Sequence, residues 1–108
     1  MAWSIKLAGK PVEREFGKLK ASLQGALIEL LGTVKRGGPQ SLEAHEAKPL
    51  KGKIWEFRVS AEDGIARALY VSISGQTVVV LHIFEKKSQK TPPQAIKLAE
   101  KRLREYVE

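Results

Sequence analysis

Within Val12–Val34, apolar residues recur every three or four positions, and lysine, arginine, glutamate and glutamine fill most of the others. This spacing is the period of a helix with one buried face. Glycines inside the stretch weaken a continuous helix by about 1 kcal/mol each relative to alanine. We therefore predict two helices, about 11–20 and 22–36, with Ser22 as the N-cap of the second. Before them, Trp3–Leu7 reads as a short strand.

Three runs of apolar and β-branched residues dominate the second half of the chain and predict strands at Ile54–Ser60, Ile65–Ser74 and Thr77–Phe84. Their connections are short and rich in turn residues, so the strands should form an antiparallel meander. The segment 41–53 has no clear period and reads as a loop with one helical turn. A basic amphipathic helix is expected after Pro92-Pro93. The predicted fold class is α+β, with a short first strand, two N-terminal helices packed on an antiparallel meander sheet, and a C-terminal helix.

Length and composition restrict the class of protein. A chain of 108 residues with 43% hydrophobic and 29% charged residues is typical of one folded domain, here 1–108. The absence of cysteine excludes a disulfide framework and a thiolate metal site. The two histidines, His45 and His82, are far apart in sequence, so we expect neither a metal site nor a cofactor. No signal peptide and no apolar run long enough to span a membrane is visible, so we expect a cytoplasmic protein.

Positive charge is concentrated in the two flanks of the chain. The formal net charge is +7, to which the first 53 residues contribute +5, the next 31 contribute −1 and the last 24 contribute +3. The last apolar strand ends in a lysine cluster, formed by Lys86, Lys87 and Lys90. Cations held on such a rigid support suit a polyanion, and RNA is the interpretation that we favour. A solvated loop and an acidic protein partner are the alternatives.

Four segments carry a resemblance to a known family: KPLKGKIWEFRV at Lys48–Val59, GIARALYV at Gly64–Val71, VVLHIFEKKSQKTP at Val79–Pro92 and AIKLAEKRLREY at Ala95–Tyr106. In these motifs and in the order of its elements, the chain resembles the RelE/ParE toxin superfamily and, within it, the HigB-like, phage-associated branch. The most specific motif is Phe-x-Lys-Lys-x-x-Lys-Thr-Pro, placed between a strand and a helix. The chain departs from the family pattern at Ala66 and Ala68, where an aromatic or second polar residue is frequent, and at Ser88, where threonine is common.

This resemblance implies a RelE-like fold and the toxin of a type II toxin–antitoxin pair. Such a toxin is an endoribonuclease that cleaves mRNA on the translating ribosome. The resemblance also implies a cognate antitoxin that inhibits the toxin, commonly a helix-turn-helix protein of the HigA type.

Metal-free RNA cleavage requires deprotonation of the 2′-hydroxyl, stabilisation of the phosphorane charge and protonation of the leaving oxygen. Arginine suits the second task because its planar fork matches phosphate oxygens. The catalytic candidates, in part implied by the resemblance, are Arg58, Arg67, Lys87 and Tyr106. The candidates for RNA binding are Lys86, Lys90 and Phe84.

Structural roles stay open for several of these residues. Each arginine could instead pair with an acidic residue at a sheet edge, namely Glu56, Glu62 or Asp63. The two aromatic candidates could instead be packing residues. Without the strand register, the sequence does not show whether Arg58 and Arg67 point into one cleft. For the function, a gyrase-directed toxin of the ParE group and a non-catalytic RNA- or protein-binding module are the alternatives.

Overall fold

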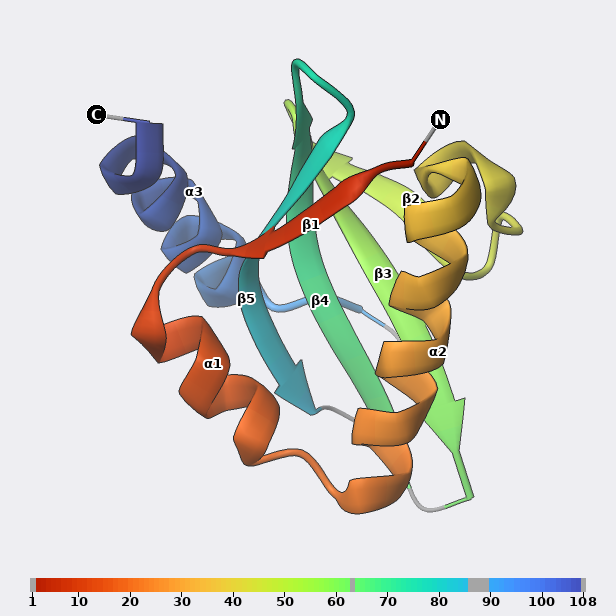
Figure 1. The fold of residues 1–108 in the computed structure, drawn as a ribbon. Helices are drawn as coiled ribbons and strands as arrows, with labels where there is room; N and C mark the ends of the chain where they lie inside the picture. Colours follow the sequence, from red (N-terminus) through yellow and green to blue (C-terminus); the bar gives the residue numbers. More distant parts are fainter. Residues whose placement is uncertain (1, 63, 86–89, 108) are drawn as a thin grey trace.

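The computed structural model of the chain describes residues 2–62, 64–85 and 90–107. The strands in these residues are β1 (Ser4–Leu7), β2 (Ala47–Lys51), β3 (Ile54–Ala61), β4 (Gly64–Ile73) and β5 (Thr77–Glu85). The helices are α1 (Lys10–Gly17), α2 (Ala21–Gly37) and α3 (Pro93–Val107), with a short 3₁₀ helix, η1 (Pro39–Ser41). The strands form a mixed sheet in the order β1-β5-β4-β3-β2 (Figure 1). The predicted α+β class and C-terminal helix are confirmed.

The sheet separates the helices into two layers. Figure 1 shows α1 and α2 on one face and α3 on the other. The predicted meander is present, because β3, β4 and β5 pair antiparallel in sequence order. The sheet extends beyond this meander at both edges. At one edge β1 pairs with β5 in parallel, and at the other β2 pairs with β3 antiparallel.

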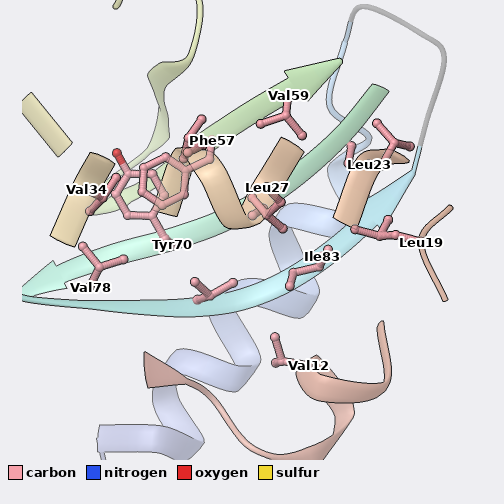
Figure 2. Close-up of a cluster of buried hydrophobic side chains, with 14 residues drawn as sticks. Val12, Leu19, Leu23, Leu27, Val34, Phe57, Val59, Tyr70, Val78 and Ile83 are labelled. Atoms are coloured by element: carbon pink, nitrogen blue, oxygen red, sulfur yellow. The ribbon is translucent and has the colours of Figure 1, made fainter. Parts of the chain in front are cut away.

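The main core lies between the sheet and the two N-terminal helices. The predicted helical stripe is buried at Leu23, Leu27 and Val34 of α2 and at Val12 of α1. Figure 2 shows these side chains directed at residues of β3, β4 and β5. Within this core the rings of Phe57 and Tyr70 stack with their centroids 3.7 Å apart. This contact joins β3 to β4 on the face opposite α3.

Two local predictions were wrong. Segment 41–53, expected to be a loop, contains β2, and the helical turn η1 begins before it at Pro39. As an edge strand, β2 leaves its residues half-buried or exposed, so no apolar alternation marks it. The N-cap of α2 is Lys20 rather than Ser22, and its side chain makes no capping hydrogen bond. The division into two helices is nevertheless confirmed.

Gly38 ends α2 in a conformation that favours glycine, with a φ of 82°. A Cβ atom here would lie 2.6 Å from Nε1 of Trp3, whereas Gly75, also at φ 82°, has open space around it. We expect Gly38→Ala to lower the free energy of unfolding by at least about 1 kcal/mol more than Gly75→Ala, because only Gly38 adds a clash to the backbone strain. Urea unfolding of both variants measures the difference. Equal losses in the free energy of unfolding for the two variants would mean that the indole of Trp3 moves aside at no cost.

Candidate functional site

Arg58 of β3 and Arg67 of β4 are direct neighbours in the sheet, since the strand register pairs their Cα atoms. Arg67 shares its strand face with Leu69, which packs in the smaller apolar cluster against Ala95 and Ala99 of α3. Both arginine side chains bind the same carboxylate, that of Glu56. The two arginines therefore meet at one site on the α3 face, but they do not open into a common cleft, because Arg67 is fully buried.

Glu56 lies at the centre of this site and its side chain is fully buried. Its Oε2 atom accepts a hydrogen bond from Nη2 of Arg58 at 3.1 Å. Its Oε1 atom lies 3.5 Å from Nη1 of Arg67. The alternative in which each arginine pairs with an acidic residue is therefore present for both arginines, with Glu56 as the shared partner, although Glu56 lies on the inner strand β3 and not at a sheet edge.

Thr91 adds a third side chain to the same carboxylate, from the segment that leads into α3. Its hydroxyl accepts a hydrogen bond from Nη1 of Arg67 at 3.0 Å and donates one to Oε1 of Glu56. Thr91 is only 6% exposed. We call Glu56, Arg58, Arg67 and Thr91 the Glu56 cluster. Two cations surround one anion in this cluster, so it carries an excess of positive charge.

The two arginines differ in their access to solvent. Arg67 is fully buried, whereas the side chain of Arg58 is 20% exposed. Burial lowers the pKa of Arg67, Glu56 opposes that shift, and the charge of Arg58 adds to it. The guanidinium nevertheless remains protonated, because arginine does not lose its proton in proteins. In this arrangement a phosphate in solution can contact Arg58 but not Arg67.

The lysine cluster lies partly outside the described residues. This applies to Lys86 and Lys87, so their predicted roles stay predictions. Lys90 is described, is exposed, and directly precedes the buried Thr91. At least one cation of the cluster is therefore next in sequence to a residue fixed to the sheet.

The two aromatic candidates occupy different parts of the molecule. Phe84 is half-buried, packs against the α3-side apolar cluster and stacks on His82 with ring centroids 4.9 Å apart. Tyr106 is 39% exposed and lines a pocket of about 370 Å³ with residues of the β1–α1 turn. It stands 13 residues after the first residue of α3, which corresponds to about 20 Å along a helix axis. Tyr106 is therefore not part of the Glu56 cluster.

A second polar cluster, which the sequence did not reveal, joins α1, β5 and α3. Oε1 of Glu15 accepts hydrogen bonds from the backbone N–H of Ile83 and from Nη1 of Arg102, each at 3.0 Å. Nδ1 of His82 lies 3.0 Å from the same oxygen. Arg102 also donates to the carbonyl of Leu81 at 2.9 Å. β1 ends its pairing with β5 at Val80, so these two side chains satisfy backbone groups of β5 beyond the end of β1.

We expect Glu15→Ala to lower the free energy of unfolding by about 1.5–3 kcal/mol, because it leaves the N–H of Ile83 without its acceptor and the mostly buried guanidinium of Arg102 without its carboxylate. Glu105→Ala is the matched control, since Glu105 is exposed on α3, and should change stability by less than about 0.5 kcal/mol. Thermal or urea unfolding measures both. A loss for Glu15→Ala no larger than that of the control would show that water replaces the carboxylate.

His45, the other histidine, lies in the exposed loop between η1 and β2. Its Nδ1 atom is 3.8 Å from a carboxylate oxygen of Glu43, and both side chains are 76% exposed. It lines a pocket of about 280 Å³ together with Arg58, Glu29 and Glu46. Among the charged residues that line it, Arg58 is cationic and Glu29 and Glu46 are anionic. Within the described ranges, no three His, Cys, Asp or Glu side chains gather as metal ligands would.

A comparison with known protein families assigns the chain to one of them. The family described as Phage derived protein Gp49-like (DUF891) matches residues 14–104, which span most of the chain and include the whole Glu56 cluster. The chain belongs to this Gp49-like family. No curated protein matches its sequence. Membership in the Gp49-like family agrees with the phage-associated part of the resemblance and with a toxin-like protein of the RelE type.

None of the helices in the described part of this Gp49-like chain has the length and apolar character that crossing a membrane requires.

Proposed function

We propose that this Gp49-like protein is a HigB-like toxin of a type II toxin–antitoxin pair, and that it cleaves mRNA on the translating ribosome. The observation that carries the proposal is the pairing of Arg58 with Arg67 across β3 and β4, next to the segment that bears Lys90. An arginine at the surface of a net positive cluster suits the phosphate backbone of RNA. The ribosome as the place of action makes the cytoplasm the expected compartment.

In this proposal Arg58 stabilises the negative charge that develops on the phosphate when the 2′-hydroxyl attacks it. Lys86, Lys87 and Lys90 hold the RNA strand or transfer a proton. Such cleavage uses only side chains and the substrate's own hydroxyl, so no cofactor is required. The proposed partner is a helix-turn-helix antitoxin of the HigA type, whose acidic groups would pair with Arg58 and the lysine cluster.

The test is induction of the chain in cells, followed by mapping of mRNA 5′ ends with and without a block on translation. New ends inside translated frames that disappear when translation is blocked would support a ribosome-dependent nuclease. Growth arrest without new ends would favour a gyrase-directed toxin. Neither arrest nor cleavage, with expression confirmed, would contradict both toxin hypotheses and favour a binding module.

A further inference from the structure

Thr91 fixes the start of the α3 segment to the sheet. It is 6% exposed, whereas the preceding residue, Lys90, is exposed. Its hydroxyl is held from both sides, by Arg67 as donor at 3.0 Å and by Glu56 as acceptor. Because consecutive Cα atoms are about 3.8 Å apart, a fixed Thr91 limits where the backbone of Lys90 can lie.

Glu56 connects this anchor to Arg58. One carboxylate oxygen, Oε1, contacts Thr91 and Arg67, and the other, Oε2, accepts a hydrogen bond from Arg58 at 3.1 Å. The same buried group is therefore bonded to both the guanidinium of Arg58 and the Thr91 segment. A small displacement of Glu56 would move both.

Arg67 makes its contacts to Thr91 and Glu56 in the interior of the protein. Its side chain is fully buried, and its Nη1 atom is directed at Thr91 and Glu56 rather than at solvent. Buried ion pairs contribute little net stability compared with apolar side chains of similar volume. Their defined hydrogen-bond geometry can instead specify the position of the groups around them.

We infer that Glu56, Arg67 and Thr91 are positioning residues of the RNA site, which hold Arg58 and Lys90 in a fixed relation so that both cations bind the phosphate backbone of one RNA strand. This inference rests on the proposed function and makes it more specific. It assigns the phosphate contact to Arg58 and changes the predicted role of Arg67 from a catalytic group to a group that acts through Glu56 and Thr91.

The first measurement is trypsin cleavage after Lys90 in the full-length chain, followed by mass spectrometry. Thr91→Val removes the hydroxyl but keeps the shape of the side chain, and Thr91→Ser keeps the hydroxyl. Thr77→Val is the matched control, because Thr77 begins β5 and makes no contact with the Glu56 cluster among the described interactions. Cleavage after the buried Arg67 reports global unfolding in the same digest.

We expect Thr91→Val to speed cleavage after Lys90 about tenfold relative to cleavage after Arg67, since a hydrogen bond to charged groups is lost. Thr91→Ser and Thr77→Val should resemble the wild type. An unchanged ratio in Thr91→Val would overturn the anchoring of Lys90. This readout requires no RNA, so it is independent of the proposed function.

The second measurement is the affinity for a short 2′-O-methyl RNA, which the protein cannot cleave, at several salt concentrations. Each phosphate contact contributes about 0.7 to the slope of log K against log salt for a single strand. We expect Arg58→Met to reduce the slope by about 0.7. Thr91→Val and Arg67→Met should weaken binding about tenfold with the slope unchanged, because both variants keep the two contacting cations, Arg58 and Lys90, and lose only their fixed relation.

A slope reduced by about 0.7 in Arg67→Met would overturn the inference, because Arg67 would then contact the RNA. Wild-type affinity in Thr91→Val would also overturn it, and this variant decides the question if Arg67→Met does not fold. If the wild-type chain does not bind the RNA at any salt concentration, the RNA-binding part of the inference fails with the proposed function. The trypsin result then shows separately whether Thr91 anchors the segment.

Discussion

Glu56→Ala is expected to lower the free energy of unfolding by about 3–5 kcal/mol, the usual loss when one partner of a buried ion pair is removed. Arg67 would keep its charge in a site from which water is excluded, and the hydroxyl of Thr91 would lose its acceptor. Since domains of this size are stable by about 5–15 kcal/mol, the variant would lose a large part of its stability. Urea unfolding followed by tryptophan fluorescence measures the change.

The matched control is Glu62→Ala, which removes the same side chain from an exposed position after the end of β3. It should change the stability by less than about 0.5 kcal/mol. The double variant Glu56→Leu/Arg67→Met should recover most of the loss, because apolar residues of similar volume replace a buried pair at little or no cost. A loss below about 1 kcal/mol for Glu56→Ala alone would contradict the burial of a charged Arg67.

This burial also changes what is expected of Arg67→Ala. From the sequence, an arginine in the middle of a strand is a poor packing residue, so its removal should spare the fold. In the structure Arg67 is among the largest fully buried side chains, and its loss leaves Glu56 with one cation fewer. Loss of toxicity in Arg67→Ala is therefore not evidence for a catalytic role unless the variant is shown to be folded.

The elements that could be predicted are those with one fully buried face. α2 buries Leu23, Leu27 and Val34 at helical spacing, so its period is visible in the sequence. β2 is an edge strand whose residues alternate only between half-buried and exposed, so local composition does not distinguish it from a loop. The parallel pairing of β1 with β5 joins residues more than seventy positions apart, and a sequence that predicts a strand does not predict its partner.

The contacts of the candidate site also fall into those that the sequence could predict and those that it could not. An isolated charge in an apolar strand predicts a specific partner, and this holds for Arg58 and Arg67. The hydrogen bond from Arg67 to Thr91, which lies 24 positions later in the chain, has no signal in the sequence. The contact between Glu15 and Arg102, 87 positions apart, has none either. Such contacts follow from how the helices pack on the sheet, and no local pattern of residues predicts them.

Arg58→Ala is expected to reduce the rate of mRNA cleavage by about 100-fold if the proposed function is right, the usual effect of removing one group that stabilises transition-state charge. Arg58 is the arginine of the Glu56 cluster that reaches solvent. Arg58→Lys keeps the charge but loses the planar fork, so its rate should lie between those of the wild type and Arg58→Ala. The measurement is the appearance of cleaved mRNA in a translating extract supplied with purified protein.

Arg14→Ala is the matched control, because Arg14 is exposed on α1, on the opposite face of the sheet from α3. It should retain the wild-type rate. The free energy of unfolding must be measured for each variant, since Arg58 also neutralises Glu56. If Arg58→Ala is folded but does not cleave mRNA, Arg58 has a role in the reaction and not only in the fold. Wild-type cleavage by Arg58→Ala would mean that the phosphate charge is stabilised elsewhere, and the Glu56 cluster would then be a purely structural ion-pair network.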